Sequence, residues 1–206
     1  MNAPPLRKGE NTRARIVDAA HSRFLEQGYH GTSMRQIADA AGITVGGLYS
    51  HFAGKEAIWE EVLATKHPAR EILPLLGDVQ GVTVADFVRD AAARLLDGLG
   101  HRPDMLKLMF IELVEFNGKH VPGLLQSALP EIAHLGSVFA GKTGALRPLP
   151  GPLLARSFIG LFFSYYVTAL FLPPAAQQPG DTDAFDTFVE IYLHGILNPD
   201  GGTDGA

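Results

Sequence analysis

The chain has 206 residues, of which 46% are hydrophobic and 19% are charged, and it contains no cysteine. This composition supplies a sizeable apolar core and argues against disorder. The absence of cysteine excludes disulfide frameworks, thiolate metal sites and cysteine nucleophiles. The polar N-terminus, residues 1–10, contains no apolar stretch of the kind found in secretion signals, so we expect a cytoplasmic protein.

The net charge of −5 is unevenly distributed along the chain. Residues 1–55 carry seven basic and four acidic side chains, a balance of +3, and the remainder carries a balance of −8. A basic head on an acidic body is expected when only one end of a protein meets phosphate. An excess of three charges also occurs on ordinary solvated faces, so the charge by itself does not decide the class.

Apolar residues recur at helical spacing along nearly the whole chain, and glycine and proline clusters separate the segments. This pattern predicts an all-α fold: an N-terminal three-helix head with a helix-turn-helix, followed by a larger helical body. The first helix is expected over 12–27, capped by Asn11 or Thr12 and ended by Gly28. Its buried stripe should consist of Ile16, Val17, Ala20 and Phe24.

The next two helices of the head are short. One is expected over 34–41, where Ser33 begins a capping box and Gly42 permits a left-handed turn. The other is expected over 45–51, and a longer helix should begin near Lys55. Two short helices joined by a glycine-bearing turn are typical of a helix-turn-helix.

Residues 32–55 read TSMRQIADAAGITVGGLYSHFAGK, which resembles the N-terminal signature of TetR-type regulators. The preceding R-x-x-I-V-D-A-A-x-x-x-F-x-x-x-G-Y resembles it as well, so the resemblance covers about residues 12–63. It implies a transcription regulator, expected to be a repressor, that binds a palindromic operator in double-stranded DNA as a homodimer. It also implies release of the operator by a small-molecule effector bound in the body, with no cofactor and no catalytic residues.

The resemblance implies a set of DNA-binding residues on the outward side of the head. Phosphate contacts are expected from Thr32 or Ser33, Tyr49, His51 and Lys55, the last at a helix N-terminus where anions are favoured. The full set is Thr32, Ser33, Arg35, Thr44, Val45, Gly46, Gly47, Tyr49, Ser50, His51 and Lys55. The alternatives are that Tyr49 and His51 are half-buried packing residues and that Lys55 is a solvated surface lysine.

Base recognition is expected from Thr44 and from Val45, whose side chain suits a thymine methyl group. Gly46 and Gly47 have no side chain and can only permit close approach to the DNA backbone. We therefore expect other residues to share in specificity, partly through minor-groove width. These are Arg35, His51 and a flexible N-terminal arm, placed over residues 1–11, which is expected to bear Arg7, Lys8 and Arg13.

The body is expected over 64–197, followed by a disordered tail over 198–206. Its helices should lie near 82–99, 103–117, 121–140, 152–172 and 182–196, with a kink at Pro130 and loops over 141–151 and 173–180. The apolar run over 157–172 has only 16 residues, whereas a membrane span needs roughly 20. We therefore predict a buried helix there and no membrane partner.

The last two helices are the expected dimer interface. The helix at 152–172 is apolar on nearly every side and must be buried. The interface residues should be Phe158, Leu161, Tyr165, Phe185, Phe188, Val189, Tyr192 and Ile196. The alternative is that both helices only fill the core of the protomer.

Glu112 falls on an apolar helix face, where a carboxylate needs a partner. One hypothesis makes it the polar anchor of a pocket for a small apolar or aromatic effector. That pocket would be lined by Met105, Met109, Phe116, Phe162 and Tyr166. The favoured alternative is an internal salt bridge or hydrogen bond, because aromatic and methionine side chains at helical spacing usually belong to a core.

Two features of the sequence could suggest an enzyme or a metal site, but neither has the context that such a site needs. Residues 136–143 read GSVFAGKT, which matches the Walker A letters, but the required strand before the loop is not predicted. The eight histidines are scattered without metal-ligand spacing, so no metal site is expected. The remaining alternative is a helical small-molecule-binding protein or enzyme whose N-terminal motif no longer binds DNA.

Overall fold

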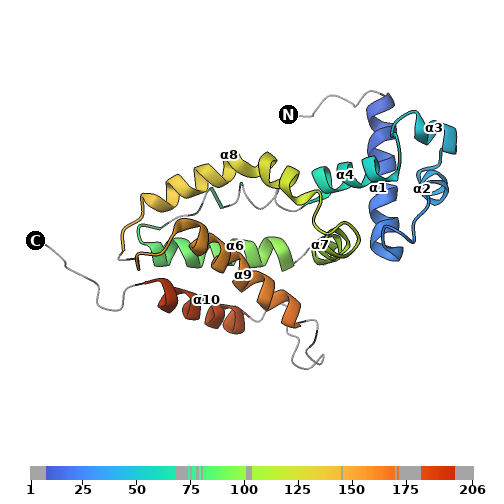
Figure 1. The fold of residues 1–206 in the computed structure, drawn as a ribbon. Helices are drawn as coiled ribbons and strands as arrows, with labels where there is room; N and C mark the ends of the chain where they lie inside the picture. The colour runs from blue at the N-terminus through green and yellow to red at the C-terminus, as the bar shows by residue number, and fades with distance from the viewer. Residues whose placement is uncertain are drawn as a thin grey trace, which may run out of the picture. The chain divides into compact units, whose positions relative to one another are not determined.

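The computed structural model describes residues 8–67, 81–100, 104–144, 146–169 and 182–197, with residues 74, 76–77, 79 and 171. Figure 1 shows the helices of these segments. They are α1 (Lys8–Gln27), α2 (Met34–Ala41), α3 (Val45–Tyr49), α4 (Lys55–Lys66), α6 (Val84–Gly100), α7 (Asp104–Glu115), α8 (Val121–Ala140), α9 (Gly151–Ala169) and α10 (Thr182–Ile196). Within the described segments only isolated β-bridges accompany the helices, which confirms the all-α prediction. None of the described helices is long and apolar enough to cross a membrane.

The helices are divided between two compact units. Unit 1 comprises residues 1–70 and 102–129, and unit 2 comprises residues 71–101 and 130–206. The division falls at Pro130 inside α8, which remains helical on both sides of the proline. The expected arm up to residue 7, the loop over 173–180 and the tail over 198–206 lie outside the described residues.

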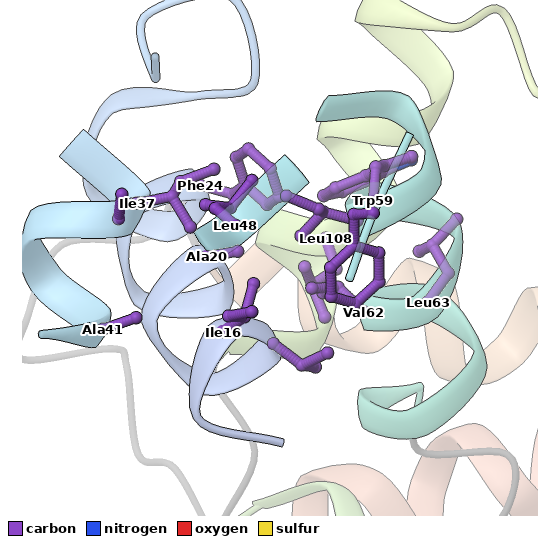
Figure 2. Packing of buried hydrophobic residues seen from close by; sticks show 14 residues of the cluster. Ile16, Ala20, Phe24, Ile37, Ala41, Leu48, Trp59, Val62, Leu63 and Leu108 are labelled. Atoms are coloured by element: carbon purple, nitrogen blue, oxygen red, sulfur yellow. The ribbon is translucent and has the colours of Figure 1, made fainter. Parts of the chain in front are cut away.

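Unit 1 has one hydrophobic core, built by α1, α2, α3, α4 and α7 (Figure 2). Trp59 is fully buried, meets Phe24 edge-on at a centroid distance of 5.3 Å and stacks on Phe116 at 5.5 Å. Leu108 of α7 is also fully buried in this cluster. The core thereby holds the helix-turn-helix on α1, α4 and α7, and the predicted stripe of α1 is confirmed as buried: Ile16, Val17, Ala20 and Phe24.

The turn of the helix-turn-helix has the predicted local structure. The Ser33 hydroxyl accepts the N–H of Gln36, whose side chain accepts the Ser33 N–H, so the capping box is confirmed. Gly42 has a φ of 64° and ends α2 in the left-handed conformation. Thr44 caps α3 by accepting the N–H of Gly47 at 3.0 Å.

Two boundaries in the head differ from the prediction. Helix α1 begins at Lys8, so Asn11 and Thr12 lie inside the helix and do not cap it. Glu10 lies in the first turn, where a negative charge interacts favourably with the helix dipole and stabilises a helix that starts this early. Helix α3 ends at Tyr49 and not at His51.

In unit 2, α9 and α10 pack against each other through aromatic side chains. Phe185 of α10 meets Phe162 and Tyr165 of α9 at centroid distances of 5.0 and 4.9 Å. Helix α6 joins α10 through an ion pair in which Arg89 Nε lies 2.7 Å from Glu190 Oε1. These contacts make α6, α9 and α10 one packed group.

The Walker-like segment has no phosphate-binding geometry. Gly136 is inside α8, which continues to Ala140. The Lys142 ammonium donates to the Gly81 carbonyl at 2.7 Å, and the Thr143 N–H donates to the Val82 carbonyl at 3.0 Å. The segment therefore closes a turn within unit 2. This agrees with the rejection of a Walker A site from the sequence.

Candidate DNA-binding interface

The helix-turn-helix presents a polar outer surface above an apolar underside. Ile37 and Leu48 are fully buried against the core of unit 1. On the opposite side, Arg35 and Ser50 are exposed, and Tyr49 exposes 54% of its surface. Tyr49 is therefore not half-buried, as the alternative required, whereas His51 is half-buried. The outer surface is open to a partner.

Two of the five residues of α3, Gly46 and Gly47, have no side chain. A Cβ atom added at Gly46 would meet nothing within 4 Å. A Cβ at Gly47 would lie 3.2 Å from Thr44 Oγ1, the atom that caps the helix. Gly46 thus leaves open space beside the backbone, and Gly47 keeps the cap undisturbed.

Thr32 was expected to contact phosphate, and this expectation was wrong for its side chain. Thr32 exposes only 2% of its surface. Its hydroxyl donates to the carbonyls of Gly28 at 2.9 Å and Arg23 at 3.2 Å. Its N–H donates to the Tyr29 carbonyl. Thr32 therefore closes the C-terminal end of α1. The sequence pattern around a threonine in this role is the same as around one that contacts phosphate, so the sequence could not distinguish the two.

Lys55 is held inside unit 1 and is not a solvated surface lysine. Its ammonium donates to the carbonyls of Tyr29 and Thr32, both at 2.6 Å, and lies 4.2 Å from the centre of the Tyr29 ring. Burial lowers the pKa of Lys55, partly offset by the charge of Glu115. Because an ammonium has three donors, these bonds leave one for another acceptor.

Arg13 is part of α1 and is not borne by a flexible arm, which corrects that prediction. Its guanidinium binds both carboxylate oxygens of Glu61, at 3.0 and 3.2 Å, and donates to the His51 carbonyl at 2.8 Å. It also lies 4.1 Å from the centre of the Phe52 ring. Lys8 is the first residue of α1, and Arg7 lies outside the described residues.

Comparisons with known proteins agree with this geometry. Residues 16–62 match the model of the bacterial regulatory proteins of the tetR family. The HTH-type transcriptional regulator TtgW of Pseudomonas putida is 33% identical over 127 residues, covering 59% of this chain and 86% of TtgW. The chain belongs to the TetR family. It is a DNA-binding transcriptional regulator and not an enzyme.

The similarity extends beyond the head. The HTH-type regulator YvkB of Bacillus subtilis is 26% identical over 190 residues, covering 90% of this chain and 97% of YvkB. The crystal structure of NalD, the secondary repressor of the MexAB-OprM multidrug efflux pump in Pseudomonas aeruginosa, is 22% identical. It aligns with a TM-score of 0.66 over 93% of this chain and all of NalD. The helical body therefore has the TetR-family fold.

Glu112 of this TetR-family protein is held by internal hydrogen bonds, the alternative favoured above. It exposes 3% of its surface. Trp59 Nε1 donates to Oε2 at 2.9 Å, and the His120 N–H donates to Oε1 at 2.7 Å. His120 Nδ1 lies a further 2.9 Å from Oε2. Phe116 packs over Trp59 in the same region of unit 1.

The other expected effector-binding residues fall in both units. Met105 and Met109 are half-buried on α7 in unit 1. In unit 2, Phe162 is buried against α10, and the Tyr166 hydroxyl donates to the Leu96 carbonyl at 3.4 Å. Burial raises the pKa of Tyr166 to about 12.

The expected dimer residues lie mostly in the seam between α9 and α10 of one protomer. Phe185, Val189 and Ile196 are buried there, which corrects their assignment as interface residues. Aromatic contacts across the seam also hold Phe158, Tyr165, Phe188 and Tyr192, and Leu161 is half-buried. The alternative, that these side chains fill the protomer core, is the better description.

The apolar surface left exposed on these two helices lies on other residues. Ile159 and Ile191 each expose 67% of their surface, and Phe163 exposes 37%. Ile159 and Phe163 are four residues apart on α9 and share one face. The sequence contained this spacing, but an all-apolar helix does not indicate which of its faces is covered within the protomer.

Proposed function

We propose that this TetR-family protein is a cytoplasmic, homodimeric repressor whose head, residues 12–63, binds a palindromic operator. A small molecule bound in the body, residues 64–197, releases it. The observation that carries the proposal is the polar, open surface of α2 and α3 above a fully buried underside. A duplex offers phosphate oxygens and base edges to such a surface.

The exposed residues divide by the part of the duplex that they suit. Arg35 and Tyr49 carry side-chain donors that suit phosphate, with His51 and the remaining donor of Lys55 as supporting contacts. The hydroxyls of Ser33 and Ser50 donate within the head, to Gln36 Oε1 at 2.8 Å and to the Gly47 carbonyl at 2.6 Å, so they are not counted as phosphate donors. Thr44 and Val45, at the start of α3, suit base edges. Gly46 and Gly47 allow the backbone of α3 to approach the groove closely.

Dimerisation through α9 and α10 supplies the second head. Ile159 and Phe163 form an exposed apolar face on α9, and Ile191 exposes a further apolar side chain on α10. A second copy covers this face by the same residues around a twofold axis. Twofold symmetry in the protein then requires a palindromic operator.

The effector is proposed to be a small apolar or aromatic molecule. Half-buried Met105 and Met109 on α7 are adaptable apolar side chains suited to such a ligand. Both carboxylate oxygens of Glu112 already accept hydrogen bonds from the protein. We therefore assign Glu112 a structural role and do not make it a ligand anchor. Effector binding lowers DNA affinity if the ligand favours a conformation in which the two heads no longer match successive grooves.

Fluorescence anisotropy with labelled duplexes from the DNA flanking the protein's own gene tests the proposal. We expect saturable binding that weakens steeply as salt rises, because counterions are released from phosphate. Tyr49→Ala should weaken binding about 10-fold by removing a phosphate hydrogen bond and its packing. Gln126→Ala, at an exposed position on α8, is the matched control and should bind as the parent protein does.

Gly46→Leu separates DNA contact from folding. The added side chain enters open space in the protein, so thermal stability should stay the same or rise slightly. The same side chain would occupy the space where the duplex approaches, and binding should be lost. Unchanged binding by both Gly46→Leu and Tyr49→Ala would contradict the proposed surface. A protein that binds none of the duplexes would favour a helical small-molecule-binding protein with an inactive motif.

A further inference from the structure

Three side chains from two distant segments of the sequence converge within unit 1. Glu56 and Glu60 lie on α4, and His120 directly precedes α8. His120 Nε2 lies 3.4 Å from Glu56 Oε1 and 3.7 Å from Glu60 Oε1. One ligand atom from each residue lies within 4.8 Å of the other two. The three residues form what we call the α4–His120 cluster.

The His120 ring is buried and oriented by its other nitrogen. Its side chain exposes 9% of its surface, and Nδ1 lies 2.9 Å from the Glu112 carboxylate. A carboxylate buried among donors accepts hydrogen bonds, so we assign Nδ1 as the donor to Glu112. Nε2, on the other side of the ring, is then the atom that can bind a metal ion.

Nε2 therefore faces two more acceptors. In the described structure it has no hydrogen-bond partner, although it is buried and aimed at the carboxylates of Glu56 and Glu60. Lys119 binds the Glu56 carboxylate but supplies no hydrogen bond to Nε2. An arrangement of three electron-pair donors around one point is the arrangement that a cation stabilises.

We propose that the α4–His120 cluster binds a divalent transition-metal ion of the Zn²⁺ class, with Glu112 as the outer partner of the imidazole. Zn–N and Zn–O bonds of the usual length place tetrahedral ligand atoms ~3.3 Å apart, close to the 3.4 and 3.7 Å observed. Metal-bound histidines characteristically donate their second N–H to a carboxylate, as His120 does to Glu112. An imidazole ligand favours zinc, cobalt or nickel over magnesium or calcium.

The site would tie α4 to the turn that follows α7, both within unit 1. Glu56 and Glu60 are four residues apart and share one face of α4, so one ion reaches both. Their side chains are 45% and 59% exposed, which leaves a solvent side for entry and for a water ligand. Since the assembled ligands exist only in the folded protein, the ion should stabilise unit 1.

Trp59 provides a direct reporter of occupancy. It is the single tryptophan of the chain, and its indole N–H binds the same Glu112 oxygen that faces His120 Nδ1. Tag-free protein stripped with a chelator should show saturable quenching of Trp59 fluorescence on titration with Co²⁺. Added Zn²⁺ should reverse the quenching and raise the thermal unfolding temperature. Quenching that rises without saturation, or that Zn²⁺ does not reverse, would overturn the proposal.

Glu60→Gln is the decisive variant, because Glu60 is exposed and its replacement leaves the buried network intact. We expect Co²⁺ affinity to fall at least about 10-fold for Glu60→Gln and for Glu56→Gln. Lys119→Ala should strengthen binding, since the Lys119 ammonium competes for Glu56. Glu131→Gln, at an exposed glutamate of α8, is the control and should bind as the parent does. Equal affinity for Glu60→Gln and Glu131→Gln would show that Glu60 does not hold the ion and would overturn the proposed site.

Discussion

The head helices α1–α4 and the pair α9–α10 differ in how many apolar side chains they expose. Among the described residues of α1–α4, the exposed large apolar side chain is Tyr49, which also carries a hydroxyl. On α9 and α10, by contrast, purely apolar side chains such as Ile159 and Ile191 are exposed. The head helices thus leave a polar outer surface, while Leu108 of α7 helps to complete their core. The pair α9–α10 has a face suited to another protein surface.

The largest expected effect is on the free energy of unfolding, through the hydrophobic core of unit 1. Phe24→Ala should destabilise the protein by about 3–5 kcal/mol, because Phe24 is fully buried and its removal leaves a cavity beside Trp59. Urea unfolding followed by circular dichroism measures the loss. Phe110→Ala, at a position 38% exposed on α7, is the control and should cost far less. Similar losses of stability for both variants would contradict the position of Phe24 in the hydrophobic core of unit 1.

Glu112→Ala tests the polar part of the same core. It leaves the Trp59 indole N–H and the His120 N–H buried without their acceptor. An unsatisfied buried donor costs about 1–3 kcal/mol, and urea unfolding should show a loss of this order or greater. Glu131→Ala, at an exposed position, should unfold as the parent does. A stability unchanged by Glu112→Ala would mean that the network contributes nothing to unit 1.

The apolar face of α9 and α10 should matter for association and not for folding. Ile159→Asp is expected to weaken the dimer by about 1–2 kcal/mol, because it places a charge in an apolar interface. Sedimentation equilibrium measures the shift towards monomer. Phe185→Ala, in the seam within the protomer, should instead lower the unfolding midpoint. A dimer unaffected by Ile159→Asp would place the interface elsewhere.

The smallest expected effect is pH-dependent. Burial raises the pKa of Glu115, but hydrogen bonds from the His30 ring and from the N–H groups of His30 and Tyr29 outweigh it, so the net pKa is lowered. A carboxyl whose folded pKa is lowered stabilises the protein above its ordinary pKa, and the stabilisation disappears as pH falls through the folded value. Glu115→Gln should therefore cost about 1 kcal/mol near neutrality and nothing in strong acid. Urea unfolding at both pH values tests this; an equal cost at both would exclude ionisation as the cause.

The sequence predicted best what depends on neighbouring residues. The capping box at Ser33, the left-handed turn at Gly42 and the cap at Thr44 are each set within a few residues, and all three are confirmed. The boundaries of α8 and α10 were also predicted from periodicity and punctuation. Such features need no knowledge of tertiary packing.

The sequence could not predict contacts that depend on which distant groups meet. Glu112 of α7 accepts a hydrogen bond from Trp59 of α4, 53 residues away. Glu61 binds Arg13 across 48 residues. Thr32 fits a phosphate-contacting pattern, but its hydroxyl is consumed by α1. The all-apolar α9 likewise gave no sign that Phe185 would cover it within the protomer.

Hydroxyl-radical footprinting on a duplex bound in the anisotropy experiment tests the central claim most directly. A dimer of helix-turn-helix heads should protect two symmetric half-sites, with their centres about one helical turn, or a multiple of it, apart. Tyr49→Ala should weaken protection in both halves equally. A single asymmetric footprint, or protection unchanged by Tyr49→Ala, would contradict DNA binding through the α2–α3 surface of a twofold dimer.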